Sequence, residues 1–146
     1  MKPKIVKDSG WDKKLLDMLD EQTLVVGLRE ANGGRTDTEL SNPEIGSFHE
    51  FGLGVPERSF LRSTFDEKEG SYKNILSKLA TRTAKQLKGN IPLELLGLKV
   101  EADVKNKIRS NIPPPLSEAT LARKKGKNVA LIDTTQLIES IDYEVR

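Results

Sequence analysis

The chain has 146 residues, of which 36% are hydrophobic and 32% are charged. This size and balance predict a single domain over residues 1–146 with a modest core, and they argue against a disordered chain or a membrane chain. The 24 basic and 22 acidic side chains give a formal net charge of +2, whereas a dedicated nucleic-acid-binding protein is usually more basic. The absence of cysteine excludes disulfides, thiolate nucleophiles and cysteine-based zinc sites. No apolar run follows the basic first residues, so we expect no secretory signal, no membrane contact and folding in a reducing cytoplasm.

The first predicted elements are a helix, a strand and a loop. Ser9 is a suitable N-cap for a helix that ends near Glu21. Its apolar stripe, which should pack on a sheet, comprises Trp11, Leu15, Leu16 and Leu19. Residues 23–28 are short and rich in β-branched side chains, which predicts a strand buried on at least one face. Residues 31–42 are polar around a central pair of glycines, which predicts a long mobile loop or an extended hairpin.

Two helices of different length are predicted next. Asn42 is expected to cap a short helix over residues 44–51 that Gly52 can end. Residues 55–61 should be extended or irregular, because Pro56 cannot donate to an interior ladder. A long helix is predicted over residues 71–88, with a possible start near residue 63. Its stripe comprises Tyr72, Ile75, Leu76, Leu79, Ala80, Thr83 and Leu87.

A second long helix follows Pro92, and a run of three prolines at 113–115 breaks the chain after it. The stripe of this helix comprises Leu93, Leu96, Val100, Val104 and Ile108. Ser117 should cap a short helix that ends near the basic run at 123–127. Asp133 and Gln136 have capping-box spacing for a helix over residues 134–140.

Residues 143–146 are expected to close the chain as a strand. Together these elements predict an α+β fold, in which a small, mainly antiparallel sheet packs against two longer helices. Short extra helices and the mobile loop at 31–42 complete this predicted architecture.

Candidate chemical sites are few. His49 and Glu50 are adjacent, as in a zinc-protease helix, but Leu53 occupies the position where a second histidine ligand is needed. No serine or carboxylate has the spacing of a nucleophile elbow or of a shared proton, and the paired glycines lack the residues of a phosphate loop. We therefore predict no catalytic residue, no cofactor and no metal site. The basic run at 123–127 could meet phosphates, although aromatic side chains that stack on bases are absent there.

Three segments of this chain together resemble the virion-morphogenesis and tail-completion proteins of tailed bacteriophages. Residues 49–52, HEFG, and 55–62, VPERSFLR, are similar to the family's (H/N)EFG followed by I-P-x-R-P-F-L-R. Residues 114–124 are similar to its proline-leucine-serine stretch before a short helix and a basic residue. Residues 131–141 are similar to its L-I-D-T-G-x-L-x-x-S-I, and residues 26–28 to its V-G-I strand.

The matches run in the same order with similar spacing from residue 23 to residue 145. Two positions depart from the pattern, because Ser59 replaces a proline and Thr135 replaces a glycine, so the local backbone can differ there. Within the resembling segments, the residues expected to serve as structural motifs are His49, Phe51, Gly52, Asp133, Thr134 and Leu137.

The resemblance implies a structural virion protein, assembled in the host cytoplasm, that forms a ring at the head-tail junction and is not an enzyme. The ring is expected to be a hexamer that contacts neck, tail-terminator or tail-tube proteins on one side and portal or adaptor proteins on the other, with DNA passing through its lumen. The residues expected to contact a partner are Glu50, Arg58, Phe60, Arg62, Arg35, Lys124 and Lys125. Alternative roles are a tail terminator, a head-closing stopper and a small DNA-binding protein.

Overall fold

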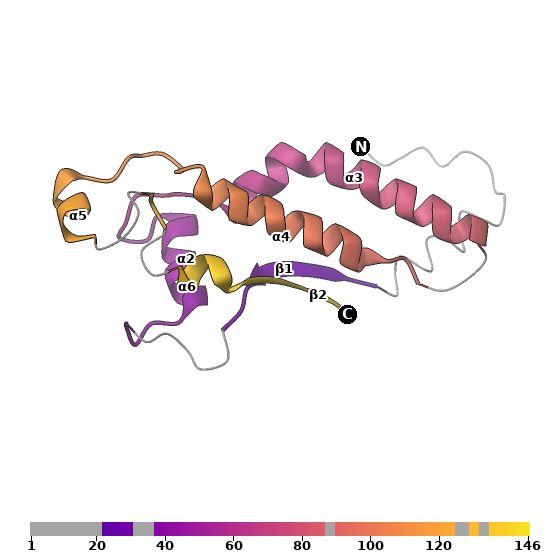
Figure 1. Ribbon diagram of the computed structural model, residues 1–146, viewed down its shortest axis with the longest axis horizontal. Coiled ribbons are helices and arrows are strands. Elements are labelled where there is room, and N and C mark those ends of the chain that lie inside the picture. Colours follow the sequence, from indigo (N-terminus) through magenta and orange to yellow (C-terminus); the bar gives the residue numbers. More distant parts are fainter. Residues whose placement is uncertain (1–21, 31–36, 87–89, 125–128, 132–134) are drawn as a thin grey trace.

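The computed structural model describes residues 22–30, 37–86, 90–124, 129–131 and 135–146, which form two strands and five helices (Figure 1). The elements in chain order are β1 Leu24–Leu28, α2 Asn42–Phe51, α3 Leu61–Gln86, α4 Leu93–Arg109, α5 Glu118–Arg123, α6 Gln136–Glu139 and β2 Ile141–Val145. The helix predicted over residues 9–21 lies outside the described residues, as do residues 31–36 of the predicted loop. No helix in the described ranges is both long and apolar enough to cross a membrane.

The sheet joins the two ends of the described chain. β1 and β2 are antiparallel, with Leu24 opposite Val145 and Leu28 opposite Ile141. Thr23 and Arg146 extend the pairing by exchanging two backbone hydrogen bonds of 2.8 and 2.9 Å. Both predicted strands are therefore confirmed, and β2 begins two residues earlier than the sequence indicated.

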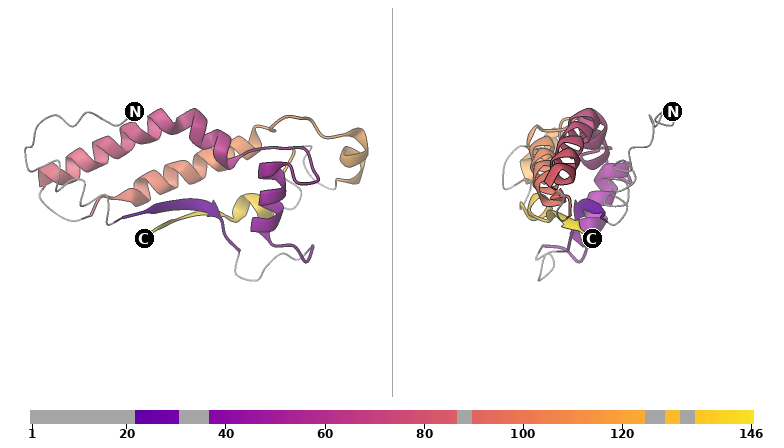
Figure 2. Two further views of the ribbon diagram at one scale, coloured as in Figure 1. Left: turned by 180° about the vertical axis from the view of Figure 1, so that it is seen from behind. Right: turned by 90° about the vertical axis from the view of Figure 1, so that its right-hand side faces the viewer.

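Helix α4 is the central layer of the molecule. It packs on both strands with one side and on α3 with another, so the sheet, α4 and α3 are stacked (Figures 1 and 2). All five residues of its predicted stripe are buried, namely Leu93, Leu96, Val100, Val104 and Ile108. The predicted α+β fold with a small antiparallel sheet and two longer helices is confirmed.

A polar cluster also connects α3 to α4. Asp103 lies on the buried face of α4 and is only 6% exposed. Its carboxylate accepts a 3.1 Å hydrogen bond from the hydroxyl of Tyr72 on α3 and pairs with the ammonium groups of Lys99, at 2.6 Å, and Lys68, at 3.3 Å. Because a buried carboxylate needs such partners to remain charged, these contacts specify how the two helices face each other.

The start of the first short helix differs from the prediction. Ser41, and not Asn42, is the N-cap of α2: its hydroxyl accepts from the backbone N–H of Glu44, and the Glu44 carboxylate accepts from the backbone N–H of Ser41. This reciprocal capping box satisfies two amides, whereas Asn42 is buried in the first turn. Gly52 ends the helix in the left-handed conformation, at φ 68°, as predicted.

The last helix also begins later than predicted. α6 starts at Gln136 with Thr135 as its N-cap, and Thr135 makes no side-chain capping bond. Asp133 and Thr134 lie outside the described residues. Thr135 has φ 64°, a left-handed conformation that is costly for a β-branched residue and free of that penalty for glycine. The backbone at Thr135 thus has a conformation that suits the glycine found at this position of the resembling pattern.

The cap predicted for α5 is confirmed, because the Ser117 hydroxyl accepts from the backbone N–H of Thr120.

Replacement of Gly97 by alanine should destabilise the fold, because a Cβ at this position of α4 would lie 2.3 Å from Cδ2 of Tyr143 on β2. Overpacking of this kind costs about 1–3 kcal/mol, which exceeds the gain of about 1 kcal/mol from helix propensity. Gly70→Ala is the matched control, because nothing lies within 4 Å of a Cβ there, and it should raise the free energy of unfolding by about 0.5–1 kcal/mol. Urea denaturation followed by circular dichroism measures both changes. Changes of the same sign in the free energy of unfolding would contradict the close packing of Gly97 against Tyr143.

Replacement of Thr135 by glycine should stabilise the protein. The substitution removes a left-handed penalty of about 1–2 kcal/mol, offset in part by the greater backbone entropy of glycine in the unfolded chain. The same denaturation experiment should show a net gain of up to about 1 kcal/mol. Thr135→Ala is the control: it removes the 2.9 Å hydrogen bond from the Thr135 hydroxyl to the Glu139 carboxylate but leaves a Cβ. A glycine variant no more stable than the alanine variant would show that Thr135 is not strained.

Candidate assembly site

Residues 49–62, called the clasp below, connect the end of α2 to the start of α3. Glu50 lies in the last turn of α2, and its side chain is only 5% exposed. Its carboxylate accepts hydrogen bonds from the backbone N–H groups of Phe60, Leu61 and Arg62, at 2.8, 2.9 and 2.9 Å. These amides belong to the first turn of α3, where no carbonyl of the helix can accept from them. Glu50 therefore caps α3 from another helix.

Ser59 completes this cap. Its hydroxyl donates to Oε1 of Glu50 at 2.7 Å and accepts from the backbone N–H of Ser63 at 3.2 Å. Two side chains thus satisfy the amides of residues 60–63, and the hydroxyl of Ser59 supplies a contact that a proline at this position could not make. This explains why α3 begins at Leu61, ten residues before the predicted start at residue 71 and two residues before the possible start near residue 63.

The ionised form of Glu50 is favoured by its surroundings. Burial raises the pKa of this carboxyl, but the hydrogen bonds from Leu61, Arg62, Ser59 and Phe60 outweigh burial and hold the pKa below its usual value. The helix dipole acts in the same direction, because the N-terminus of α3 carries partial positive charge. Glu50 is therefore a carboxylate at neutral pH, as a charged helix cap requires.

Arg62 covers the outer side of the clasp. Its guanidinium donates to the Glu50 carboxylate at 3.1 Å, to the Glu50 carbonyl at 2.6 Å and to the Glu57 carboxylate at 2.9 Å. The guanidinium also lies over the Phe51 ring, 4.9 Å from its centroid. Half of the Arg62 side chain stays exposed, so Arg62 belongs both to the internal cap and to the molecular surface.

Arg58 and Phe60 make their contacts inside the subunit. Arg58 is 4% exposed, and its guanidinium donates two hydrogen bonds to the Pro114 carbonyl, at 3.1 and 2.7 Å. This contact ties the clasp to the proline segment, so two of the segments that resemble the phage family meet in space. Phe60 is fully buried in the core. Sequence reasoning placed Arg58, Phe60 and Glu50 among the partner contacts, whereas the structure gives each of them an internal one.

His49 contributes little chemistry in this arrangement. Its Nδ1 atom is buried and has no hydrogen-bond partner within the part of the chain that the structure describes. Burial, and then the positive charge of Arg58, lower the pKa of His49, so the ring is neutral at pH 7. No group of three or more potential metal ligands was found among the described residues.

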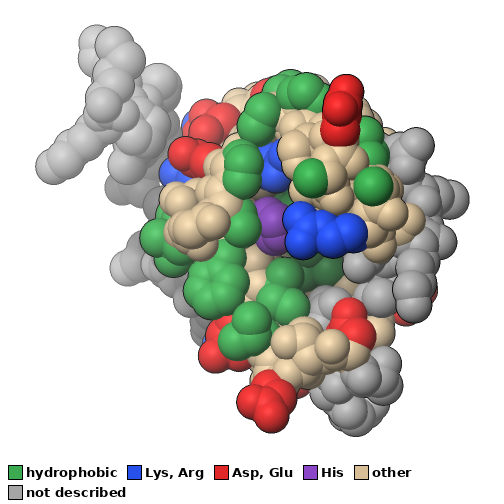
Figure 3. All heavy atoms as spheres, turned by 90° about the vertical axis from the view of Figure 1, so that its left-hand side faces the viewer, with side chains coloured by type: hydrophobic (Ala, Val, Ile, Leu, Met, Phe, Trp, Pro, Cys, Tyr) green, Lys and Arg blue, Asp and Glu red, His purple; other side chains and the backbone are tan. Residues whose placement is uncertain are grey.

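The surface of the clasp is an apolar loop at residues 51–55. Phe51 and Leu53 are 56% and 57% exposed, and Val55 is 36% exposed. Gly52 and Gly54 alternate with them at φ 68° and 73°, and the Leu53 N–H donates to the Phe48 carbonyl at 2.9 Å. Apolar side chains gather on the surface at this end of the molecule (Figure 3). Large apolar side chains on an ordered loop are typical of a contact surface.

The remaining predicted site residues are distributed elsewhere. Lys124 donates from Nζ to the Val129 carbonyl at 2.6 Å, and Leu137 is buried in α6. Arg35 and Lys125 lie outside the described residues. Phe51 is among the predicted structural motifs, whereas Leu53 and Val55 are not among the predicted site residues. The alternation of apolar residues with glycine in FGLGV is the signal that could have identified the loop.

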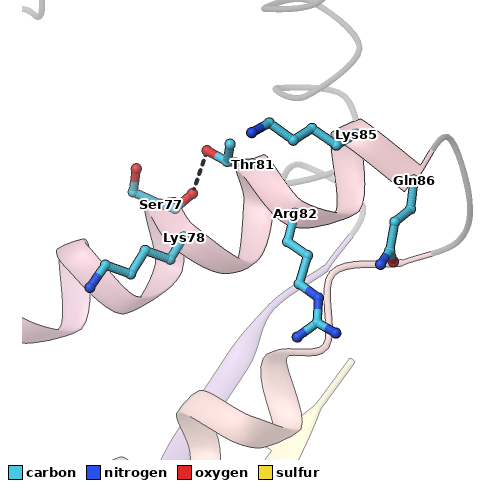
Figure 4. A pocket seen from close by; sticks show the side chains of 6 residues that line it. All are labelled: Ser77, Lys78, Thr81, Arg82, Lys85 and Gln86. Carbon is cyan, nitrogen blue, oxygen red and sulfur yellow. Dashed lines mark hydrogen bonds between the residues drawn. The ribbon is translucent and has the colours of Figure 1, made fainter.

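A basic face that sequence reasoning also missed lies near the end of α3. Lys78, Arg82 and Lys85 recur at i, i+4 and i+7, beside a shallow hollow of about 460 Å³ (Figure 4). Ser77, Thr81 and Gln86 complete its lining. Across the described ranges, no carboxylate forms an ion pair with these three cations. The face could therefore interact with an anionic partner such as a phosphate backbone.

Comparison of the chain with protein-family models, with curated proteins and with solved structures found no match. The resemblance to phage tail-completion proteins accordingly stays a prediction. The site itself consists of the buried residues of the clasp, which organise the fold, and of the exposed apolar loop at residues 51–55 that they hold in place.

Replacement of Glu50 by glutamine should destabilise the protein by about 2–4 kcal/mol at pH 7, because a buried charged acceptor is lost and an amide group faces backbone donors. Glu57→Gln is the control, because its side chain is 58% exposed and its only ion pair among the described residues is with Arg62; it should change stability by less than about 0.5 kcal/mol. Urea denaturation at several pH values measures these differences.

The pH dependence of this difference follows from the lowered pKa of Glu50. The carboxylate contributes its full stability above the unfolded pKa of about 4.3 and loses it as the pH falls through the lower folded pKa. The stability of the wild type and of Glu50→Gln should therefore converge only in the acid range. A difference that stays constant between pH 7 and pH 2 would show that the charge of Glu50 is unimportant.

Proposed function

We propose that this chain is a structural subunit of a tailed-phage virion, of the neck or tail-completion kind, which assembles as a ring at the head-tail junction. The observation that carries the proposal is the apolar loop at 51–55, which the clasp holds in an ordered conformation while three large side chains remain exposed. A monomeric protein gains nothing from exposing such a loop, whereas a subunit in a larger assembly can bury it against a neighbour. The three sequence segments that resemble the family support the same assignment.

The geometry also gives the resembling segments a physical role. The clasp, through Arg58, contacts the proline segment at Pro114, and α2 lies against α6, which belongs to the third segment. These parts form one end of the molecule, which carries α2, α5 and α6 (Figure 1). The proposed ring would use this end as a contact surface. Tail-terminator and head-closing stopper roles would use the same surface against different neighbours.

A second candidate, a small DNA-binding protein, is favoured by the basic face on α3. Three phosphate contacts from Lys78, Arg82 and Lys85 predict a slope of about −2.7 in a plot of log affinity against log salt concentration. Such weak, sequence-independent binding would fit a subunit that lies close to DNA within a ring as well as a regulator. The location of the protein therefore distinguishes the two functions better than DNA binding alone.

Purified particles from the phage that encodes this chain test the proposal. Mass spectrometry should find the protein in intact particles, and cryo-electron microscopy should show a ring between portal and tail tube into which the α3–α4 layer and the sheet fit. Particles that lack the protein, combined with tight salt-dependent binding to duplex DNA, would contradict the structural role and favour the regulator.

A further inference from the structure

An apolar groove of about 360 Å³ lies between α3 and the start of β1. Its apolar lining comprises Phe65, Tyr72 and Leu76 on α3, Leu24 on β1, and Leu96 and Val100 on α4. The Phe65 ring contacts the Tyr72 ring edge-on, with centroids 5.8 Å apart, yet Phe65 stays 40% exposed. The described part of the chain therefore leaves an aromatic wall of this groove uncovered.

The described chain begins at one end of the groove. Leu24 and Leu76 both pack against the buried cluster that includes Ile91, so they mark this end, called the near end below. Gln22 fixes the chain there, because its side chain accepts from the Ile91 N–H at 2.9 Å and donates to the Ile91 carbonyl at 3.2 Å. Phe65 lies about three turns earlier on α3, at the far end, away from the point where α4 and β1 begin (Figure 1). The segment that precedes Gln22 thus joins the described chain at the near end.

The segment that precedes the described chain has the pattern of a helix that would fit the groove. Residues 9–21 are predicted to be helical, with an apolar stripe of Trp11, Leu15, Leu16 and Leu19. A helix over residues 9–21 is about 20 Å long, and the α3 wall from Phe65 to Leu76 is about 17 Å long. Glu21 and Leu24 can be at most about 10 Å apart along the chain. The segment can therefore extend along the groove of its own chain.

The outer face of the sheet, as far as the structure describes it, is charged. On this face Val25 lies opposite Glu144 and Gly27 lies opposite Asp142, whereas the alternate residues of β1 pack in the core. Arg29 forms ion pairs with both carboxylates, at 2.6 Å to Glu144 and 3.4 Å to Asp142. An apolar stripe is not stabilised by burial against such charges. The predicted packing of the stripe on a sheet therefore indicates the groove beside β1 and not the outer face.

The charges along the groove favour one direction for the segment. Asp66 and Glu69 lie on the α3 wall toward the far end, and Lys73 lies nearer the near end. A helix that runs into the near end brings Lys13 and Lys14 toward the acidic part of this wall. Glu69 already pairs with Lys73 at 2.5 Å, whereas Asp66 is exposed and forms no ion pair with another described residue. Exposed ion pairs add little stability, so charge supports the direction and apolar burial supplies the stabilisation.

We propose that residues 9–21 form a helix that packs into this groove of its own chain, parallel to α3. Trp11 lies toward Phe65 at the far end, and Leu19 lies toward Leu76 at the near end. The contact is intramolecular, because the chain is fixed at Gln22 beside the groove and needs no second copy to reach it. This inference goes beyond the proposed function and does not depend on it.

Trp11 tests the contact directly, because it is the single tryptophan of the chain. In the full-length protein its fluorescence should be shifted to the blue and poorly quenched by acrylamide, relative to the urea-unfolded protein. Phe65→Asp should move the emission maximum and the quenching constant toward the unfolded values, with unchanged circular dichroism. Leu98→Asp is the matched control, because Leu98 is 54% exposed on α4 and does not line the groove, and it should change neither value. Emission that does not respond to Phe65→Asp would overturn the inference.

Disulfide formation gives a second readout that a poorly folded variant cannot imitate, since the chain has no cysteine of its own. The full-length double variant Leu19→Cys/Leu76→Cys should form an intrachain disulfide under mild oxidation and stay a monomer in non-reducing electrophoresis. Leu19→Cys/Leu98→Cys is the control and should form this bond much more slowly. Equal rates in the two variants would overturn the inference. A disulfide dimer of Leu19→Cys/Leu76→Cys would also overturn it, because the groove would then hold the segment of a second copy.

These measurements separate the inference from the proposed function. Both use the isolated subunit and need neither a ring nor a particle. Absence of the protein from virions together with the intrachain disulfide would refute the proposed function and leave this packing standing. Presence in virions without the disulfide would do the reverse.

Discussion

The fold depends on one carboxylate in an unusual position. Glu50 ends one helix and accepts the free amides that begin the next, so the chain reversal between α2 and α3 is fixed by charge and not by a local turn. Without this acceptor, buried amides at the start of α3 would lack partners, and the helix would start later or the clasp would open. The long helix is then held against α4, which in turn covers the sheet.

Local patterns predicted the parts of the fold that local physics determines. The buried face of α4, from Leu93 to Ile108, was visible as helical periodicity, the Ser117 cap as a polar residue before a helix, and Gly52 as a helix end, and all are confirmed. The pairing of β1 with β2 could not be predicted, because the partner strands are more than a hundred residues apart and no turn connects them. The sequence indicated the start of α3 only loosely, at residue 71 or near residue 63, for a similar reason, since most of its cap comes from Glu50 on another helix.

For the candidate site too, the sequence predicted some features and only the folded structure shows the others. The sequence singled out Glu50, Arg58, Phe60 and Arg62 as one motif, but it could not show that burial separates them. Three of them are internal, and only Arg62 keeps half of its side chain at the surface. Leu53 and Val55 were missed, because the glycine alternation in FGLGV indicates a loop but not that the rest of the fold leaves its apolar side chains exposed.

Substitutions of buried and of exposed residues in the clasp should impair different properties of the protein. Loss of the Arg58 guanidinium removes two hydrogen bonds to Pro114 from a buried site, so any loss of the proposed ring would follow from a weakened subunit. Loss of Leu53 removes exposed apolar surface, so it should change the stability of the folded subunit little but weaken the contact in the proposed assembly. Under the proposed function both substitutions would prevent assembly, and only the stability of the isolated subunit distinguishes them. The motif therefore combines a structural role with the proposed contact role, because its buried residues hold the loop in a conformation that leaves the apolar side chains exposed.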